Sequence, residues 1–228
     1  MEVYPIDKFK DKTIIVEKNS ASPTNQYYIT TKYQQYIESI LLSRGTLIDR
    51  IERIAYDMIQ KYQNKQITFL VILKGAIFFA DILNEKLCEL LKVNYNENQM
   101  DFVFDYVTIS SMEGTKSSGI VKLKSDLSVF ENLKGKDVVI IEDIYDTGRS
   151  CATLLDYINK YEPKSIEVAF LFHKMNLANL KYNLMPEFIG FLIPDMFVAG
   201  VGMDYNDQFR DLNHLCVINE KAIETFKR

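Results

Sequence analysis

The sequence has few cysteines and few histidines, the side chains that bind most transition metals. Its three cysteines, Cys88, Cys151 and Cys216, form no CxxC pair, and an odd number cannot all pair within one chain. We therefore expect neither a disulfide framework nor a zinc site, but buried free thiols in a reducing compartment. The two histidines, His173 and His214, are isolated from one another, and we interpret both as structural.

The sequence also lacks a long hydrophobic run and an excess of positive charge. No run of about eighteen apolar residues occurs, and the segment MEVYPIDKFKDK contains no apolar core of a signal peptide. We therefore expect a cytoplasmic protein with no membrane partner. The 27 Lys and Arg and 31 Asp and Glu give a net charge of −4, which disfavours nucleic acid as the main partner because nucleic acid binds basic surfaces. A local basic pocket for one small anion remains compatible with that charge.

What the sequence does contain is enough apolar residues for one sizeable core. Hydrophobic residues make up 47% of the 228 positions, and no repeat, low-complexity tract or linker divides the chain. Continuous apolar runs alternate with segments whose apolar residues recur at helical spacing. This alternation of buried strands and helices is typical of an α/β fold with a parallel sheet covered on both faces. Strands are predicted at 13–16, 67–73, 101–109, 120–123, 137–141, 165–172 and 188–192. Helices are predicted at 46–62, at 78–91 and over Leu154, Leu155 and Ile158.

Charged residues stand where three of these apolar strands end. Lys74 follows one strand, Glu142 and Asp143 follow a second, and His173 with Lys174 follows a third. In parallel α/β sheets, ligands bind beyond the carboxyl ends of the strands. The sequence therefore predicts that these side chains converge on one rim.

The stretch VVIIEDIYDTGRS, residues 138–150, joins a strand to a helix through a Thr-Gly turn. Such a turn aims unpaired backbone N–H groups at one point and forms a cradle for a phosphate. Taken alone, it favours an ordinary helix cap, with Ser150 or Thr147 as the capping hydroxyl. Glu142 and Asp143 favour a ligand site over an ordinary cap. Carboxylates would repel a phosphate, but they suit ribose hydroxyls or a developing positive charge. Together these features predict a phosphorylated ribose whose anomeric carbon becomes cationic.

Two other classes of protein are disfavoured by the same stretch. A P-loop needs an early glycine and a lysine, whereas Tyr145 stands nearest the glycine position and Arg149 replaces the lysine. A phospho-acceptor receiver domain carries its acid pair on its first strand, whereas Glu142 and Asp143 lie late in this chain.

With this stretch the chain resembles the type I phosphoribosyltransferases, in particular the hypoxanthine-guanine branch of that family. The stretch is similar to the family's signature for phosphoribosyl diphosphate. Further similar segments, in the same order, are GTLIDRIERIAYDMI (45–59), VILKGAIFFADIL (71–83), SSMEGTKSSG (110–119) and EFIGFLIPDMFVAGVGMDYNDQFRDLNHLCVINE (187–220). The resemblance implies a parallel-sheet fold with helices on both faces and a small hood subdomain. Residues 1–228 would form a single domain, with the core at about 37–186 and 214–220 and the hood from the N-terminal segment and about 187–213.

The resemblance also implies an activity in purine salvage. This activity is the Mg²⁺-dependent transfer of a 5-phosphoribosyl group from 5-phosphoribosyl 1-diphosphate to N9 of hypoxanthine or guanine, giving IMP or GMP and diphosphate. The expected partners are these small molecules and further copies of the chain, in a homodimer or homotetramer. The alternative is a non-catalytic sensor or regulator of the same fold, which the net charge and the full set of catalytic side chains disfavour.

Carried over to this chain, the family's pattern implies a role for each site residue. Asp146 would be the catalytic residue that exchanges a proton with purine N7. The phosphoribosyl-binding residues would be Glu142, Asp143, Ile144, Tyr145, Asp146, Thr147, Gly148, Arg149 and Ser150. The diphosphate-binding residues would be Lys74, Gly75, Ser111 and Arg210, with a cis peptide at Leu73–Lys74. The purine-binding residues would be Lys174, Met196, Phe197, Val198 and Asp204, and the magnesium ligands Asp204, Glu142 and Asp143.

Two of these roles also have a simpler interpretation. Lys174 would donate a hydrogen bond to the 6-oxo oxygen of the purine, but without the resemblance it favours an ordinary solvated strand end. Phe197 would stack on the purine ring, and it fits a core position equally well.

The chain departs from the family's pattern in two segments and at one isolated position. Where the family usually has IIDTGKT, this chain has IYDTGRS, in which Tyr145 is the bulkiest change. Met112 stands where the family's closing loop usually has a tyrosine. We expect the absence of that hydroxyl to affect how the loop closes and how fast the reaction proceeds. Met196 stands where some relatives have lysine, which concerns base preference.

Overall fold

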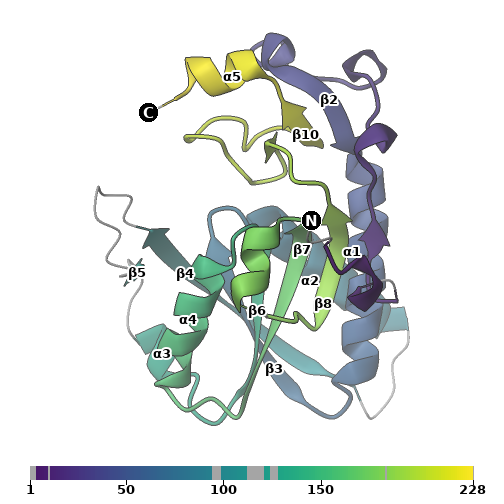
Figure 1. The fold of residues 1–228 in the computed structure, drawn as a ribbon. Coiled ribbons are helices and arrows are strands. Elements are labelled where there is room, and N and C mark those ends of the chain that lie inside the picture. Colours follow the sequence, from purple (N-terminus) through teal and green to yellow (C-terminus); the bar gives the residue numbers. More distant parts are fainter. Residues whose placement is uncertain are drawn as a thin grey trace.

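The computed structural model describes residues 4–9, 11–93, 99–111, 121–123, 128–182 and 184–227. Met112 and the rest of the expected loop lie outside this part of the chain, as do the side chains of Ser111, Arg149 and Ser150. The fold is the expected α/β arrangement, with a large sheet, helices on both of its faces and a second, smaller sheet (Figure 1).

The large sheet has seven strands in the order β1-β8-β7-β6-β3-β4-β5. Neighbouring strands are parallel from β1 to β4, and the edge strand β5 runs antiparallel to β4. The strands are β1 (Ile14–Ile15), β3 (Gln66–Leu73), β4 (Asp101–Ser111), β5 (Val121–Leu123), β6 (Asp137–Tyr145), β7 (Ser165–Lys174) and β8 (Phe188–Ile193). Every strand predicted from the sequence is present, and the predicted parallel sheet is confirmed.

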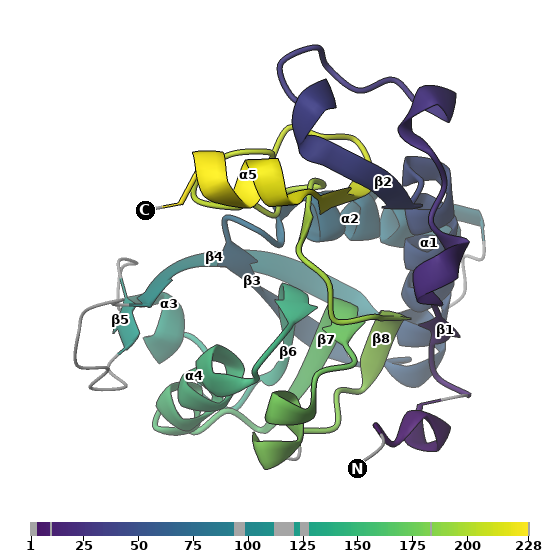
Figure 2. The ribbon, with the colours of Figure 1, turned by 45° about the horizontal axis from the view of Figure 1, so that its top comes forward.

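Helices cover both faces of the large sheet, as Figure 2 shows. One face is covered by α1 (Arg44–Lys61) and α2 (Ile77–Val93), and the other by α3 (Ser128–Glu131) and α4 (Arg149–Asn159). None of the helices in the described ranges is long and apolar enough to cross a membrane.

The two faces of the sheet carry two separate hydrophobic cores, because successive side chains of a strand point to opposite faces. In β6, Val139 and Ile141 pack among residues of α1 and α2. Val138 and Ile140 pack instead among residues of α3 and α4. This burial on both faces explains why the strand reads as a continuous apolar run, and it holds the end of β6 rigidly where the polar residues begin.

The smaller sheet forms the hood, with the order β2-β10-β9 and antiparallel pairing. Its strands are β2 (Ile37–Leu42), β9 (Val198–Ala199) and β10 (Leu215–Ile218), followed by helix α5 (Glu220–Thr225). The hood has its own core, in which Tyr33, Ile40, Phe209 and Cys216 are buried together. Short 3-10 helices lie at Ile6–Lys8, Lys18–Ser20, Thr24–Gln26, Gln34–Tyr36 and Leu177–Tyr182.

The division between core and hood differs from the expected one. We expected β8 in the hood, but it pairs with β7 in the large sheet. We expected the segments of β2 and β10 in the core, but these strands pair with each other in the small sheet. The physical reason is that β2 and β10 pair over a long sequence separation, with Leu42 opposite Leu215, which local patterns do not reveal. We propose a single domain whose hood comprises β2, β9, β10 and α5.

Two strands also extend further than predicted. The apolar run of β6 ends at Ile141, but its pairing with β7 continues through Tyr145, which lies opposite His173. Likewise, β7 continues to Lys174, which lies opposite Ile193 of β8. The polar residues expected just beyond the strands are therefore held within the regular hydrogen-bonded ends of the strands, which fixes their directions.

Candidate active site at the carboxyl ends of the strands

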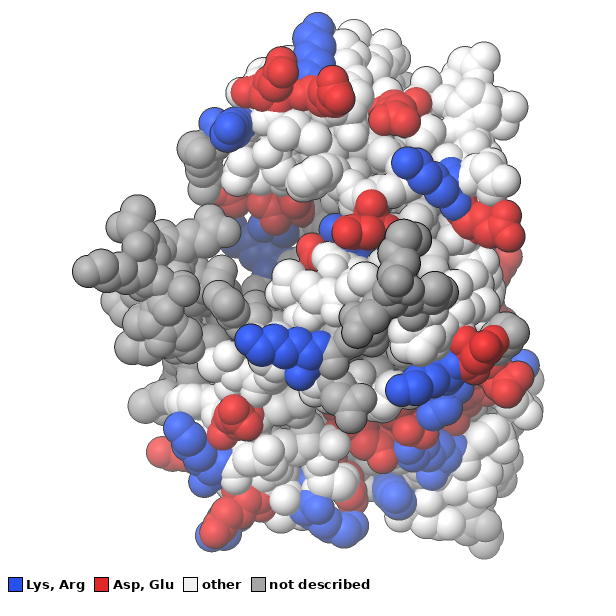
Figure 3. Space-filling model, in the orientation of Figure 1, with Lys and Arg blue, Asp and Glu red and all other residues white. Residues whose placement is uncertain are grey.

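A hollow lies between the large sheet and the hood, with basic atoms inside it and acidic atoms along its upper edge (Figure 3). The carboxyl end of β3, the end of β6 and the segment between β9 and β10 meet there. Gly75 lies directly against Asp143, because a Cβ atom added at Gly75 would be 1.8 Å from Asp143 Oδ2. Gly202, with a positive φ of 95°, also lies close to Gly75, because a Cβ atom added at Gly202 would be 2.4 Å from the Gly75 carbonyl oxygen. Three chain segments therefore converge, and two of them, the ends of β3 and β6, are among the three strand ends predicted to do so.

The acid pair at the end of β6 is strongly influenced by burial. Burial, together with the neighbouring Asp143 charge, raises the pKa of Glu142 to about 8. Burial also raises the pKa of Asp143 to about 6, although the backbone N–H of Ile144, which donates to Asp143 Oδ1 over 2.8 Å, opposes the shift. Glu142 Oε2 is buried and has no hydrogen-bond partner among the described residues. An enclosed acceptor without a donor indicates a place for a ligand group that donates one.

Asp146 and Lys174 come together from adjacent strand ends. Lys174 Nζ lies 3.2 Å from Asp146 Oδ2 and 3.8 Å from Asp195 Oδ1. Asn176 Nδ2 donates to the other Asp146 oxygen over 3.4 Å. Lys174 is 8% exposed, so its ammonium is held at the rim rather than free in solvent. The simpler interpretation of Lys174 as a solvated strand end is therefore wrong.

The Thr-Gly turn leads directly into α4. Gly148 occupies the N-cap position with φ of 79°, a left-handed conformation that favours glycine. Because glycine has no side chain, the N-cap residue itself supplies no capping group to the helix. A cavity of about 220 Å³ lies against this turn and is lined by residues 142–148 and Cys151. The cavity therefore borders the amino end of α4, the kind of place where helices bind anions.

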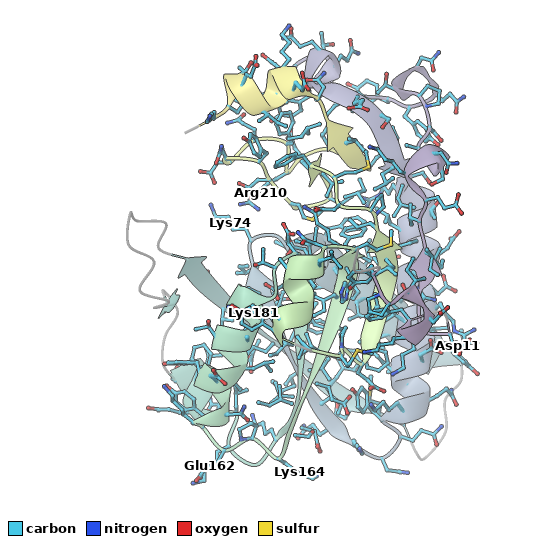
Figure 4. The ribbon with its side chains drawn as sticks, in the orientation of Figure 1. Asp11, Lys74, Glu162, Lys164, Lys181 and Arg210 are labelled. Carbon is cyan, nitrogen blue, oxygen red and sulfur yellow. The ribbon has the colours of Figure 1, made fainter. Side chains whose placement is uncertain are left out.

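Basic residues line a second, larger cavity of about 580 Å³ between β3 and the hood. Lys74, Arg210 and Arg44 are among its lining residues, and Lys74 and Arg210 lie next to one another across the hollow (Figure 4). Arg210 pairs with Asp204 over 2.6 Å and donates to the carbonyl oxygen of Gly202 over 2.7 Å. The Leu73–Lys74 peptide is cis, as the resemblance implied.

Met196, Phe197 and Val198, which are expected to bind the purine, lie on the segment that enters the hood. Phe197 is 57% exposed, so it is not a core residue, and its ring lies edge-on to that of Tyr205 with centroids 6.3 Å apart. Met196 and Val198 are partly buried against the core of the large sheet. Of the three, Phe197 is the residue that offers an open aromatic face.

Sequence reasoning missed three residues at this site: Asn176, Asp195 and Arg44. Asn176 and Asp195 each follow the end of a strand, so the strand-end rule could have found them. Arg44 begins α1 and reaches the larger cavity only through the fold, with its guanidinium 5.0 Å from the Phe78 ring centre, and no sequence signal indicates it.

The contacts of both histidines fit the structural roles expected for them. His173 Nε2 lies 2.7 Å from the Tyr4 hydroxyl, and burial lowers its pKa to about 4. His214 Nδ1 accepts a hydrogen bond from the Arg44 backbone N–H over 3.0 Å. The cysteines are free, Cys151 and Cys216 buried and Cys88 partly buried, as expected.

The carboxylates of the site fit magnesium better than a metal bound entirely by protein. No group of three or more metal-binding side chains occurs within the described ranges. The charge of Asp143 acts on Glu142 and that of Asp204 on Asp143, and Glu142 Oε2 has no hydrogen-bond partner among the described residues. Magnesium is commonly held by one or two carboxylates together with substrate phosphates, which matches this donor set.

Comparison with known proteins agrees with the geometry of the site. The family model described as "Phosphoribosyl transferase domain" matches residues 39–208. The hypoxanthine-guanine phosphoribosyltransferase of Bos taurus is 36% identical over 218 residues, covering 94% of this chain and 96% of that protein. The Homo sapiens enzyme of the same name is 37% identical over 205 residues, covering 88% of this chain and 90% of that protein.

A solved structure is similar over the same extent. It is hypoxanthine-guanine phosphoribosyltransferase from Schistosoma mansoni in complex with IMP, with a TM-score of 0.77 and 26% identity. The match covers 94% of this chain and 98% of that chain.

Proposed function

The chain belongs to the phosphoribosyltransferase family, and from that premise we propose that it transfers a 5-phosphoribosyl group from 5-phosphoribosyl 1-diphosphate to hypoxanthine or guanine. Its role is purine salvage, in which a free base becomes IMP or GMP and diphosphate is released. The observation that carries the proposal is the ion pair of Asp146 with Lys174, 3.2 Å apart. It joins the phosphoribosyl-binding loop to the residue that recognises the purine.

The purine is recognised from three sides. Lys174 donates to the 6-oxo oxygen that hypoxanthine and guanine share, whereas the 6-amino group of adenine would place a donor against a donor. Phe197 stacks on the ring, and the backbone of Val198 contacts its N1/C2 edge. Asp146 exchanges a proton with N7, which lies next to the 6-oxo group on the purine, so its closeness to Lys174 suits both tasks.

The acid pair serves the ribose. Glu142 and Asp143 hydrogen-bond the ribose hydroxyls, and the carboxylate of Asp143, whose pKa of about 6 leaves it charged at neutral pH, stabilises the cation that grows on the ring as the C1–O bond breaks. The turn from Thr147 to Ser150 holds the 5′-phosphate at the amino end of α4, where the helix dipole favours an anion. The acids and the cradle thus act on opposite ends of one sugar phosphate.

The diphosphate is held on the other side of the hollow. Lys74, Gly75, Ser111 and Arg210 bind it, and its oxygens offer the Arg210 guanidinium the same kind of acceptor that Asp204 offers in the structure. Magnesium, when bound, would be held by Asp204, Glu142 and Asp143 with substrate oxygens, and would neutralise charge on the departing diphosphate.

A direct assay tests this function. The full chain is incubated with 5-phosphoribosyl 1-diphosphate, Mg²⁺ and either hypoxanthine or guanine, and the nucleotide and diphosphate are measured. We expect both products in equal amounts, and none when EDTA removes the metal. Binding of IMP without any turnover would favour the sensor or regulator of the same fold instead.

We further propose that the chain associates as a homodimer or homotetramer. The support is its similarity over nearly its whole length to the family, and light scattering on the full chain measures the assembly directly. A monomer at all concentrations with full activity would contradict this part of the proposal.

A further inference from the structure

Tyr145 is the most conspicuous departure of this chain from its family within the phosphoribosyl loop. The usual IIDTGKT has an aliphatic residue at this position, and the tyrosine is fully buried here, at 2% exposure. Its aromatic ring lies between two others on the neighbouring strand β7, with ring centres 5.0 Å from Phe170 and 4.8 Å from His173. The ring is therefore held firmly, and the hydroxyl has a fixed position.

That position is directly beneath the phosphate-binding turn. A Cβ atom added at Gly148 would lie 2.3 Å from the Tyr145 hydroxyl oxygen and 2.6 Å from Cζ. The end of the phenol thus fills the space on one side of Gly148, the residue whose left-handed conformation turns the chain into α4. An aliphatic side chain branches and ends near its own backbone, so it would leave this space unfilled.

The residues behind Tyr145 hold it against the turn. His173 packs on its ring and is itself fixed from behind, because its Nε2 lies 2.7 Å from the Tyr4 hydroxyl and its ring lies 5.0 Å from that of Phe9. Burial keeps the imidazole neutral, with a pKa of about 4, and the phenol protonated, with a pKa of about 12. No charge change at neutral pH disturbs this stack.

We propose that Tyr145 is a positioning residue for the donor substrate: through its contact with Gly148 it fixes the turn that binds the 5′-phosphate. This inference rests on the proposed function for the identity of the ligand. Tyr145 acts through Gly148 rather than on the reacting atoms, so its effect is on phosphate binding and not on the purine side of the site. The fixed turn lowers the entropy that the loop loses when the phosphate binds.

The test measures binding rather than turnover, with ribose 5-phosphate as the probe in calorimetry on the full chain. Tyr145→Ile restores the family's residue, and Tyr145→Phe removes only the hydroxyl. We expect Tyr145→Ile to weaken ribose 5-phosphate binding by roughly 2- to 12-fold, the range of one neutral hydrogen bond or comparable contact, and Tyr145→Phe to weaken it less. The KM for hypoxanthine should stay unchanged in both. Tyr157→Phe, which removes a bonded hydroxyl from α4 at a distance from the turn, is the matched control and should bind as the parent does.

A second measurement tests the contact itself. Gly148→Ala should abolish binding in the parent, because the added methyl meets the Tyr145 hydroxyl and the left-handed backbone is strained. In the Tyr145→Ile background the first cause is removed, so Gly148→Ala should cost measurably less, by at least about 5-fold in affinity, as expected for residues in contact. Additive effects of the two substitutions would contradict the inference.

The outcomes separate this inference from the proposed function. Unchanged ribose 5-phosphate affinity in both Tyr145 variants would overturn the positioning role while leaving the transferase intact. A parent that binds ribose 5-phosphate but makes no nucleotide would overturn the transferase, and weaker binding by Tyr145→Ile would still support the positioning role. Weakened binding of hypoxanthine to the same degree would mean a general loss of structure and would also overturn the role.

Discussion

At the scale of single residues, the sequence predicts which segments converge from the points where an apolar strand stops and charged residues begin. Lys74, Glu142 and Lys174 were all found in this way, and the structure brings their segments to one hollow. The residues alone could not show which side chains pair. The 3.2 Å contact of Asp146 with Lys174 depends on two strands lying side by side in register. Asn176 and Asp195 follow strand ends and were open to the same rule, but only the structure shows that they face Asp146 and Lys174.

The carboxylate of Asp146 is predicted to carry the proton transfer at N7. Asp146→Asn should lower turnover by roughly 10²–10⁴-fold, the usual contribution of a general acid or base, with little change in donor binding. Asp195→Asn is a matched control, since Asp195 also faces Lys174 but at 3.8 Å, and it should lower turnover far less. Equal turnover in the Asp146 variant and the parent would remove Asp146 from the chemistry.

The ammonium of Lys174 is predicted to bind the 6-oxo group of either base. Lys174→Ala should raise the KM for both hypoxanthine and guanine by roughly 10- to 100-fold, as expected for a hydrogen bond from a charged donor. Lys164→Ala, at the other end of the same strand and paired with Asp137, should leave both KM values unchanged. An effect on only one of the two bases would refute the assignment.

The buried acid Glu142 is predicted to make the unliganded protein less stable as pH rises. Its pKa rises from an ordinary 4.5 to about 8 on folding, so the folded state holds a proton that the unfolded state has lost between those values. Its stabilisation is therefore complete below about pH 4.5 and is lost as pH rises to about 8. Glu142→Gln cannot titrate, so its thermal midpoint should exceed that of the parent at pH 8.5 by on the order of 10 °C, because a pKa shift of this size is worth several kcal/mol at roughly 2–4 °C per kcal/mol. The difference should shrink at pH 5; a constant difference across this range would contradict the pKa shift.

At the scale of elements, the strongly periodic segments were predicted and the short ones were not. Helix α1 and strands β3, β6 and β7 follow their patterns closely, because each is buried against a large core. Strands β2, β9 and β10 escaped prediction, since short apolar runs do not distinguish strand from helix and β9 has only two residues. The expected loop at 110–119 lies from Met112 onward outside the described residues, so its role stays a prediction.

Helix α1 is fastened to the large sheet by Arg50. Its guanidinium donates to the carbonyl oxygens of Gly190, Ile189 and Lys12 over 2.6–2.9 Å, joining the helix to β8 and to the N-terminal segment. Arg50→Leu should lower the free energy of unfolding by about 2 kcal/mol or more, because buried carbonyl groups lose their donors. Arg53→Leu, one turn further along and more exposed, breaks only its pair with Asp57 and should cost about 0–1 kcal/mol. Urea denaturation compares the two, and equal losses would contradict the fastening role.

At the scale of the whole molecule, the large sheet supplies the phosphoribosyl loop and Lys174, while the segment leading into the hood supplies Phe197 and the connection from β9 to β10 supplies Asp204 and Arg210. The proposed reaction needs both parts, since in the proposal the sugar phosphate binds on one side and the diphosphate and purine ring reach the other. Sequence resemblance covers both parts in order, which is why the activity could be inferred before the fold. The exact partition between them could not, because the chain crosses from sheet to hood and back through strands paired over long separations.

The central claim, transfer to 6-oxopurines, is tested most directly by comparing kcat/KM for hypoxanthine with that for adenine. The measurement uses the full chain, 5-phosphoribosyl 1-diphosphate and Mg²⁺, with nucleotide formation as the readout. A site built to hydrogen-bond one group rejects a base that lacks it, so hypoxanthine should be favoured on the order of 10⁴-fold. Comparable values for the two bases would contradict the account, because Lys174 would then not be reading the 6-oxo group.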